Sequence, residues 1–428
     1  MNLRQAMSRF QNTIYARAVR HGLTLAIPFL IMGSFALLLT NFPLGVYQDF
    51  IRTWMNSAAS AILETLYQIS LGSLALVLTV TISISYGHLT ETDQLFLYPI
   101  VAVCSYLAFC GGIENQSDYI FNAEWVFTAM VITLLSCVLF HKILKLGHRF
   151  ERLHTTGADY LFNISIQCLI PVILVSLFFA VTGYVLRVAW DSSNITNFGS
   201  YLFLKLFDKI SGNLFGILLY VVMTHLLWFM GIHGTNTLEA VSRHLFEQNV
   251  EINQSLLLAG HIPTEIFSKT FLDTFVFIGG CGTALSFVLA LYIASKQSHN
   301  RKMSFVALPS ALFNISEIAV FGFPIIFNLT MLIPFILTPV ILTLISASAI
   351  KAGLVPAVTQ SVEWTIPVLL SGYQATGSVS GSLLQLFNLL VGVFIYMPFV
   401  RRSEKQETGK FKQAVRQMEQ DMAAGERD

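Results

Sequence analysis

The sequence predicts an all-α integral membrane protein with about ten transmembrane helices. Hydrophobic residues make up 54% of the 428-residue chain, and its mean hydropathy is +0.66. Charged residues make up only 11%, whereas a soluble domain carries about 25%. In addition, charge-free apolar runs recur along the chain at about the 20-residue length that crosses a bilayer. Composition and run length therefore agree on the membrane class.

The predicted spans and half-spans follow one another along most of the chain. They are 22–48, 68–87, 95–113, 125–140, 160–186, 210–232, 274–295 and much of 303–400. Prolines interrupt several of them, at Pro28, Pro171, Pro334 and Pro339. Membrane helices tolerate proline where neighbouring protein satisfies the freed backbone groups, so we expect kinks at these positions.

Basic residues gather at four places, which sets the expected orientation. The clusters lie at 4–20, 142–152, 296–302 and 401–405. The positive-inside rule predicts that all four are cytoplasmic, with an uncleaved N-terminus. Three clear spans separate 152 from 296, where an even number is required. Either the segment 234–272 contains a re-entrant piece, or the cluster at 296–302 is an exception to the rule.

Two shorter segments, 200–212 and 254–272, mix apolar and charged residues. This pattern is typical of interfacial amphipathic helices and equally of ordinary loop helices. The charged stretch 401–428 indicates a cytoplasmic tail, either a solvated helix or a linker.

Charge and cysteine usage argue against several other functions. The formal net charge of +1 offers no field that would attract nucleic acid. The cysteines sit in apolar stretches without the close pairing of a zinc site or a redox motif. They are Cys104, Cys110, Cys137, Cys168 and Cys281. We therefore expect no metal site and no cofactor.

Glu317 is the leading candidate for a functional residue. Between Met303 and Val400 the charged residues are Glu317, Lys351 and Glu363. A carboxylate at membrane depth costs on the order of 2.5 kcal/mol and is normally kept where it faces a cavity or a ligand. Its context, ALPSALFNISEIAVFGFP, breaks the apolar run. We expect a re-entrant hairpin over 304–324 that presents Asn314 and Glu317 to a cavity; the alternative is a loop at the interface.

A second re-entrant hairpin is expected over 358–381. There Trp364 and Pro367 precede a Gly- and Ser-rich turn that contains Gln374 and Thr376. The face of Trp364 could support a sugar ring, but tryptophan is also enriched at membrane interfaces, and both interpretations stay open.

A glycine-flanked histidine ends one of the apolar spans. In WFMGIHGTNT the span stops at Gly231, His233 and Gly234 before a polar stretch. Glycine lets backbone or ligand approach closely, and imidazole can exchange hydrogen bonds with a hydroxyl. A lone histidine is more often structural, and for His225 in the same span we favour a place in the core.

Four stretches together resemble the IIC component of the lactose/cellobiose/diacetylchitobiose phosphotransferase permeases. They are NTIYARAVRHGLTLAIPFLIMGSFALLLTNFP, WFMGIHG, the long run from FIGGCGTALSF to FILTPV, and EWTIPVLLSGYQATGSVSGSLLQLFNLL. The third is the most specific, because this family usually shows Asn-Glu-Pro, then Phe-Gly and a proline, then a long Ile-Pro-Phe span. The likeness covers most of the chain from 12 to 400.

This resemblance implies an N-terminal dimerisation bundle over 1–200 and a sugar-binding transport domain over 201–400. It implies a homodimer that sits among membrane lipid in the bacterial cytoplasmic (inner) membrane. Glu317 falls on the family's sugar-binding glutamate and His233 on its histidine. The expected substrate contacts are His233, Gly234, Asn314, Ser316, Glu317 and Trp364, around a sugar like cellobiose, lactose or diacetylchitobiose.

The chain departs from the family pattern at two places. It reads Ser316-Glu317-Ile318 where relatives have Asn-Glu-Pro, so it keeps the carboxylate but lacks the amide and the proline. It also reads Arg20-His21-Gly22 where relatives often have an acidic residue before the glycine.

The implied activity is sugar translocation coupled to phosphorylation by a separate IIB protein that carries a phosphocysteine. Phosphoryl transfer depends mainly on positioning, and Glu317 with His233 is the pair expected to hold the hydroxyl and accept its proton. One alternative is a membrane sugar sensor or anchor without phosphotransfer, linked to a signalling partner. Another is an ion-coupled sugar carrier with Glu317 as the proton site.

Overall fold

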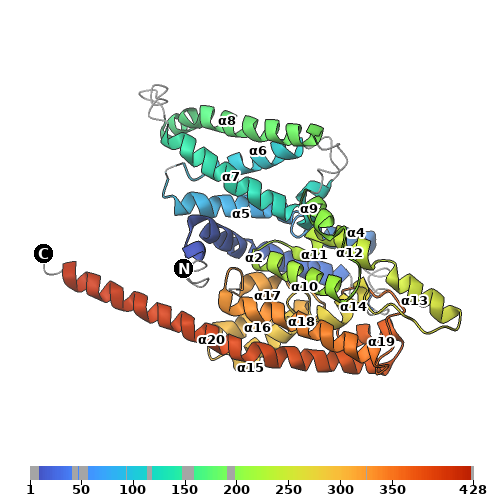
Figure 1. Ribbon diagram of the computed structural model, residues 1–428. Helices are drawn as coiled ribbons and strands as arrows, with labels where there is room; N and C mark the ends of the chain where they lie inside the picture. Colours follow the sequence, from blue (N-terminus) through green and yellow to red (C-terminus); the bar gives the residue numbers. More distant parts are fainter. Residues whose placement is uncertain are drawn as a thin grey trace. The chain divides into compact units, whose positions relative to one another are not determined.

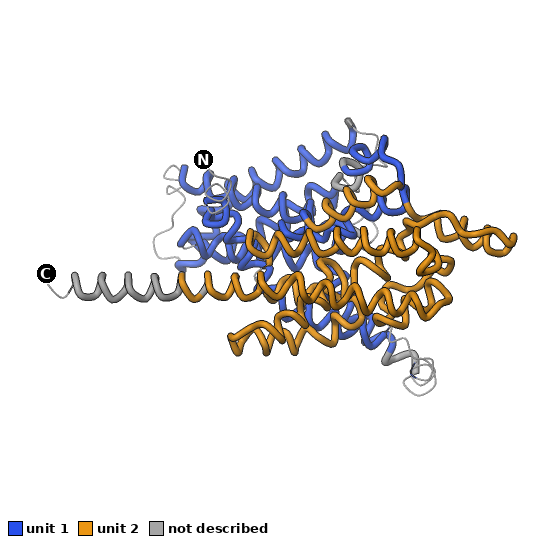
Figure 2. The backbone as a smooth tube through the Cα atoms, turned by 60° about the horizontal axis from the view of Figure 1, so that its bottom comes forward, with its two compact units in different colours: residues 1–212, 226–245 blue, residues 213–225, 246–428 orange. Residues whose placement is uncertain are grey.

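The computed structural model describes residues 9–40, 47, 56–92, 94–112, 118–146, 159–189, 198–323 and 325–425. Regular structure within these ranges is helical throughout, with no strand, so the predicted all-α class is confirmed. The basic residues Arg4, Arg149 and Arg152 of the predicted clusters lie outside the described residues. The chain forms two compact units, coloured separately in Figure 2.

Unit 1 consists of residues 1–212 and 226–245. Its α-helices are α2 (Ile14–Thr40), α4 (Asn56–Gln68), α5 (Leu74–Leu89), α6 (Leu97–Cys110), α7 (Val126–Lys145), α8 (Tyr160–Ala189), α9 (Phe198–Phe207), α11 (Gly234–Thr237) and most of α12 (Glu239–Phe246). Helix α5 packs against α2, α6 and α7, and α6 also packs against α7 and α8 (Figure 1).

Small residues let the helices of unit 1 approach closely. A Cβ on Gly22 of α2 would lie 2.6 Å from the Ile82 side chain of α5, and a Cβ on Gly183 of α8 would collide with the Phe109 carbonyl of α6. Close approach through glycine is a usual source of helix association in a bilayer, where apolar burial gives little drive. Arg187 then donates from Nη1 to the Phe109 carbonyl oxygen at 2.6 Å, which satisfies an acceptor at the end of α6.

Unit 2 consists of residues 213–225 and 246–428. The chain passes from it into unit 1 within α10 (Leu214–Phe229). Its other helices are α13 (Asn249–Leu258), α14 (Lys269–Phe271), the π-helix η6 (Leu272–Val276), α15 (Ala284–Ala294), α16 (Ser298–Leu312), α17 (Glu317–Gly322), α18 (Leu329–Lys351), α19 (Leu370–Thr376) and α20 (Val379–Gly425). Helices α15, α18 and α19 pack on α20, and α16 packs on α15 and α17.

Five helices in the described part of the chain are long and apolar enough to cross a membrane. They are Ile14–Thr40, Ala123–Lys145, Tyr160–Val188, Leu329–Lys351 and Val379–Gln406. Shorter apolar helices are Leu74–Leu89, Leu97–Cys110, Leu214–Phe229 and Ala284–Ala294. The prolines predicted as kinks, Pro28, Pro171, Pro334 and Pro339, all lie inside unbroken helices.

The predicted span 274–295 is not one helix. It starts in η6, breaks over 277–283, and becomes α-helical only from Ala284. The cause is the Gly279, Gly280 and Gly282 cluster, in which each glycine takes a positive φ that most residues avoid.

The two mixed segments and the tail also take definite forms. Helix α9 covers most of 200–212, and α13 is followed by a non-helical stretch over 261–268. Beyond residue 401, α20 continues without a break to Gly425, so the described part of the tail is helical (Figure 1).

Candidate functional site

Asn314 ties together three breaks in the helical structure of unit 2. It follows the end of α16 with a left-handed φ of 62°. Its Oδ1 accepts a hydrogen bond of 2.7 Å from the backbone N–H of Gly279. Its Nδ2 donates to the carbonyl oxygens of Trp364, at 2.6 Å, and Ile366, at 3.2 Å. One buried side chain thus satisfies backbone groups from two other non-helical segments.

The glycine loop lies directly against the turn between α16 and α17. A Cβ on Gly280, whose φ is 93°, would stand 2.6 Å from the carbonyl oxygen of Asn314 and 2.7 Å from Cβ of Ser316. Only glycine fits such a contact, because both the backbone angle and the space exclude a side chain. The loop therefore forms one wall of the turn that leads into Glu317.

Glu317 is the first residue of α17, and Ser316 precedes it as the N-cap. Ser316 is 4% exposed, and Glu317 is half-buried. A carboxylate in the first turn is stabilised by the partial positive charge of the helix N-terminus. The start of α17 therefore favours a carboxylate at position 317, even though most neighbouring residues in the sequence are apolar.

Trp364 lies in a non-helical segment between α18 and α19. Its backbone is held by Asn314, and its side chain remains 41% exposed. The position of the indole is therefore set from the backbone, and a large part of the ring stays accessible. An accessible aromatic ring beside a buried polar turn is suited to stacking against a sugar.

Two amide side chains of α20, Gln385 and Asn388, form hydrogen bonds with the backbone of η6 and of the segment at the start of α19. Gln385 Oε1 accepts from the N–H groups of Leu369 and Gly372, both at 2.8 Å. Gln385 Nε2 donates to the Thr274 carbonyl oxygen at 2.7 Å. Asn388 donates to the carbonyl oxygen of Phe275 at 2.9 Å and to Ser346 Oγ at 2.8 Å. These amides allow η6 and the start of α19 to be irregular while buried.

Both ends of the α16–α17 pair lie against one stretch of α20. At the start of α16, Asn300 Nδ2 donates to Glu404 at 2.8 Å. After α17, Asn328 Nδ2 donates to Ser403 Oγ at 3.4 Å. The helix pair thus leaves one end of unit 2 and returns to the same end, with Asn314 and Ser316 at its turn.

His233 is the N-cap of the short helix α11 in unit 1. Its Nδ1 accepts from the Asn236 N–H at 3.4 Å and pairs with the Thr235 hydroxyl at 3.2 Å. The ring of Trp228 lies 4.4 Å away between centroids. With Nδ1 as the acceptor, a neutral imidazole carries its proton on Nε2. Gly234, the next residue, is buried.

His225 has a structural place, in agreement with the core interpretation. It is 0% exposed, its Nδ1 pairs with the Val221 carbonyl oxygen at 2.6 Å, and its Nε2 accepts from the Gly282 N–H at 2.8 Å. Both ring nitrogens are engaged, and Nε2 supports the same glycine loop that borders Asn314.

The predicted site residues divide between the units. Asn314, Ser316, Glu317 and Trp364 belong to unit 2, where Asn314 links the turn to the Trp364 segment. His233 and Gly234 belong to unit 1, so their pairing with Glu317 stays a prediction. Sequence reasoning did not find the supporting residues Gly279, Gly280, Gln385 and Asn388. The pattern Gly-Gly-Cys-Gly and the lone amides in the apolar part of α20 could have indicated them.

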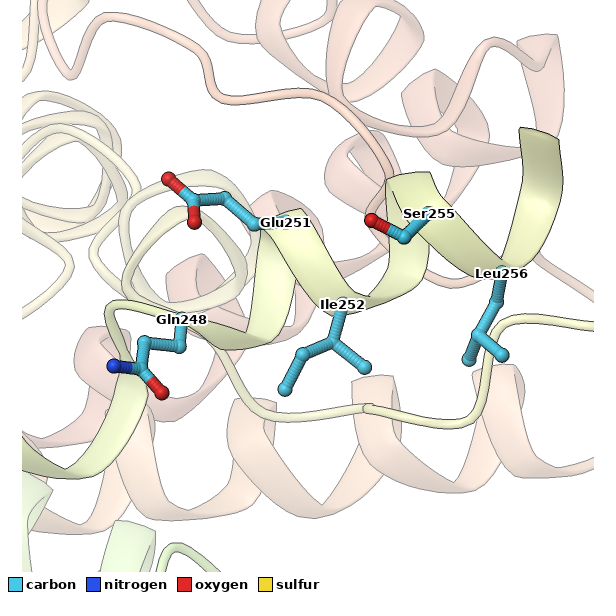
Figure 3. A pocket seen from close by; sticks show the side chains of 5 residues that line it. All are labelled: Gln248, Glu251, Ile252, Ser255 and Leu256. Carbon is cyan, nitrogen blue, oxygen red and sulfur yellow. The ribbon is translucent and has the colours of Figure 1, made fainter. Parts of the chain in front are cut away.

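A pocket of 480 Å³ on α13 lies apart from these residues. It is lined by Gln248, Glu251, Ile252, Ser255 and Leu256. Figure 3 shows Glu251 and Ser255 on one side of the helix and Ile252 and Leu256 on another, as expected for side chains four residues apart. None of the predicted sugar contacts is among its lining residues, so we do not assign the site to it.

Comparison with known proteins decides the family. A family model described as "Phosphotransferase system, EIIC" matches residues 20–339. The chain belongs to this family. It is therefore an integral protein of the bacterial cytoplasmic (inner) membrane and a IIC sugar permease that works with a IIB protein. The comparisons give no support to the sensor alternative.

Relatives across nearly the whole chain are IIC components too. The chain is 28% identical over 410 residues to the lichenan permease IIC component of Bacillus subtilis, covering 92% of this chain and 90% of the relative. It is 27% identical to the oligo-beta-mannoside-specific EIIC component of the same species, covering 98% and 96%. It is 26% identical to the cellobiose-specific EIIC component of Geobacillus stearothermophilus, covering 92% and 91%.

A solved structure supports the fold of the permease. The crystal structure of the transporter ChbC, the IIC component from the N,N'-diacetylchitobiose-specific phosphotransferase system, aligns with a TM-score of 0.51 and 24% identity. The alignment covers 96% of this chain and 98% of ChbC. The alignment extends over most of both units and supports a IIC fold.

Proposed function

We propose that the permease carries a disaccharide like cellobiose, lactose or diacetylchitobiose and binds it at the turn between α16 and α17. The observation that carries this proposal is the Asn314 amide, which joins the glycine loop, this turn and the Trp364 segment. The names of the relatives, which refer to lichenan, oligo-beta-mannoside and cellobiose, favour this sugar class.

The α16–α17 pair serves as a re-entrant hairpin in this proposal. Its two ends bond to Glu404 and Ser403, one residue apart on α20, so the pair enters and leaves on one side. Arg401 and Arg402 mark that side as cytoplasmic by the positive-inside rule. A chain break at membrane depth is tolerated where it lines protein or a cavity, which suits a ligand site at the turn. The non-helical Trp364 segment forms the second hairpin and meets the first at Asn314.

Sugar contacts come from His233, Gly234, Ser316, Glu317 and Trp364. The carboxylate of Glu317 accepts hydrogen bonds from sugar hydroxyl groups, the imidazole of His233 donates one to a hydroxyl oxygen, and Trp364 stacks on a ring face. Ser316 has a shorter side chain than the family's asparagine, and a water can occupy the difference. Asn314 acts mainly by shaping the site, because its amide is already bonded to Gly279, Trp364 and Ile366.

Glu317 and His233 also act in the chemical step. The primary hydroxyl oxygen of the sugar attacks the phosphorus of the phosphocysteine on IIB, the P–S bond breaks, and the cysteine leaves as thiolate. The hydroxyl proton passes to Glu317 or His233. The chain thereby supplies positioning and a proton acceptor, while the phosphoryl group comes from IIB.

The domain roles are part of the same proposal. Residues 1–200 form the dimerisation bundle of a homodimer among membrane lipid, 201–400 form the transport domain, and 401–428 form a cytoplasmic tail. The two compact units change near residue 212, but residues 226–245, which this proposal counts with the transport domain, belong to unit 1.

The test compares Glu317→Gln and His233→Ala with Glu363→Gln as the matched carboxylate control, since Glu363 is exposed. Each purified variant is assayed for cellobiose binding and, in proteoliposomes with phosphorylated IIB, for sugar phosphate. We expect both site variants to lose phosphorylation by at least about a hundredfold, as for removal of a group that transfers a proton. Unchanged activity in both would reject the site. Uptake that needs an ion gradient but no IIB would favour the ion-coupled carrier.

A further inference from the structure

Exposed basic side chains gather where α20 meets the turn between α15 and α16. We call this group the cationic face. It consists of Lys296, Arg301, Lys302, Arg401, Arg402 and Lys405, and all six residues are exposed. Figure 1 shows α15 and α16 beside this part of α20. The face thus combines two segments about a hundred residues apart in the chain.

Glu404 holds the two segments of the cationic face together. It is 6% exposed and accepts hydrogen bonds from the Ser295 hydroxyl, from the Lys296 N–H at 3.1 Å and from Asn300 Nδ2 at 2.8 Å. Within the turn, Arg301 Nε donates to the Ser295 carbonyl oxygen at 3.0 Å. A buried carboxylate with three donors fixes its surroundings, so the six cations are held on a rigid base.

The positive charge of this face is not neutralised within the segments that form it. Glu404 is the one carboxylate in 295–302 and 401–405, and its partners are a hydroxyl, an amide and a backbone N–H. Among the described residues, none of the six cations forms an ion pair. Arg301 and Lys302 also lie near the N-terminus of α16, where the helix dipole disfavours cations. Helix stability therefore does not account for this charge.

We propose that the cationic face is the docking surface for phosphorylated IIB. This inference rests on the proposed function, in which IIB delivers its phosphoryl group from the cytoplasm. Phosphorylation adds a charge of about −1.5 to −2 to IIB, and electrostatic attraction of an anionic partner raises the rate of encounter, while the phosphoryl transfer itself takes place at the turn before Glu317 and not on the face. The positive-inside rule places the face on the cytoplasmic side, where IIB is found.

Two features favour a protein over anionic lipid as the occupant. Lipid headgroups are fluid and need positive charge but no fixed arrangement, whereas Glu404 fixes the arrangement here. In addition, α20 continues as a helix from Lys405 to Gly425, a rise of about 30 Å at 1.5 Å per residue, so a protein partner would have a long helix to contact beside the face.

The face is also joined to the sugar site by one helix. Arg301 lies in the first turns of α16, and the last residue of that helix, Leu312, is followed by Phe313 and Asn314. The helix has 15 residues and is about 22 Å long. A docked partner would therefore contact the start of the hairpin whose turn holds Glu317.

The test uses the full chain in proteoliposomes, with and without phosphatidylglycerol, and titrates phosphorylated IIB. The charge-reversal pairs are Arg301→Glu with Lys302→Glu and Arg401→Glu with Arg402→Glu; Lys351→Glu, an exposed lysine at the far end of α18, is the control. We expect the KM for phosphorylated IIB to rise about tenfold in both pairs, with kcat and cellobiose binding unchanged. For the native chain, raising salt from about 0.05 to 0.5 M is expected to raise the same KM.

Several outcomes would overturn the proposal. A KM for IIB that is unchanged in both pairs, or insensitive to salt in the native chain, rejects docking at this face. Activity that follows phosphatidylglycerol content with an unchanged KM assigns the face to lipid. Where a reversal prevents insertion, the neutral pairs with glutamine are used and are expected to raise KM to a smaller extent. Failure of the native chain to bind cellobiose, lactose and diacetylchitobiose alike would instead reject the proposed function.

Discussion

The side-chain amide of Asn314 donates a hydrogen bond of 2.6 Å to the carbonyl oxygen of Trp364, 50 residues further along the chain. Through this bond the turn before Glu317 and the segment that carries an exposed indole become one structure. The same side chain accepts from Gly279, so a third segment depends on it. The stability of the site thus depends on Asn314, whose two polar side-chain atoms are both hydrogen-bonded to backbone groups.

Replacing Asn314 with aspartate should disrupt this arrangement. A carboxylate cannot donate to the carbonyl oxygens of Trp364 and Ile366, and it would repel them. Leaving buried groups unpaired costs about 1–3 kcal/mol, so we expect a lower thermal midpoint and a loss of cellobiose transport. Asn249→Asp is the control, since Asn249 Nδ2 donates to the Phe267 carbonyl oxygen at 2.6 Å without contact to the site. It should lose stability and keep transport; equal transport in both variants would contradict the role of Asn314.

Gly280→Ala should weaken sugar binding through sterics. The added Cβ would lie 2.6 Å from the Asn314 carbonyl oxygen, so the turn before Glu317 would have to move. Gly353→Ala is the matched control, because Gly353 has a similar positive φ of 72° but nothing within 4 Å of the added Cβ. Both variants carry backbone strain of about 1–2 kcal/mol, and only Gly280→Ala should raise the dissociation constant for cellobiose. The measurement is calorimetric titration of the purified variants.

Gln385→Leu should destabilise unit 2 strongly. Leucine has a similar volume but leaves the N–H groups of Leu369 and Gly372 and the carbonyl oxygen of Thr274 without this partner. With about 1–3 kcal/mol for each buried unpaired group, we expect a large fall in the thermal unfolding midpoint in detergent. Gln374→Leu, at an exposed position of α19, should change it little. A Gln385→Leu protein as stable as the native chain would show that these bonds are dispensable.

Trp364 should affect sugar affinity more than stability. Its side chain is 41% exposed, while its backbone is held by Asn314, so truncation to alanine removes ring area without removing the anchor. We expect Trp364→Ala to raise the KM for cellobiose about tenfold with a small change in thermal midpoint, and Trp364→Phe to recover most of the affinity. An alanine variant with native KM would favour the interface role for this residue.

Much of the architecture could be predicted from hydropathy and isolated charge. The lone carboxylate in a long apolar region pointed to Glu317, and the polar Asn-Ile-Ser-Glu stretch pointed to a break, which the structure has between Leu312 and Glu317. These features are local in the sequence. A local pattern is enough to indicate that a helix is interrupted. Backbone N–H and C=O groups without hydrogen bonds are very unfavourable within a bilayer, so a break is usually accompanied by polar residues nearby in the sequence.

What supports the break could not be predicted in the same way. Gly279 and Gly280 were included in an apolar span, because hydropathy does not register positive φ angles. The sugar contact expected of Asn314 stays a prediction, and the bonds of its amide to residues 35 to 52 positions away were not foreseen. Such partners depend on topology, and a single sequence does not specify which distant carbonyl an amide will meet.

The continuity of α20 has a further consequence. Gln385 and Glu404 lie 19 residues apart on one helix, about 28 Å, so the same rod braces the irregular segments near one end and the α15–α16 turn near the other. Pro398 lies inside the helix between the two braces, and a change of bend there would strain both sets of bonds. We therefore expect this braced assembly to move as one block when bound sugar is exposed to either side, so a crosslink from α15 to α20 should leave turnover intact.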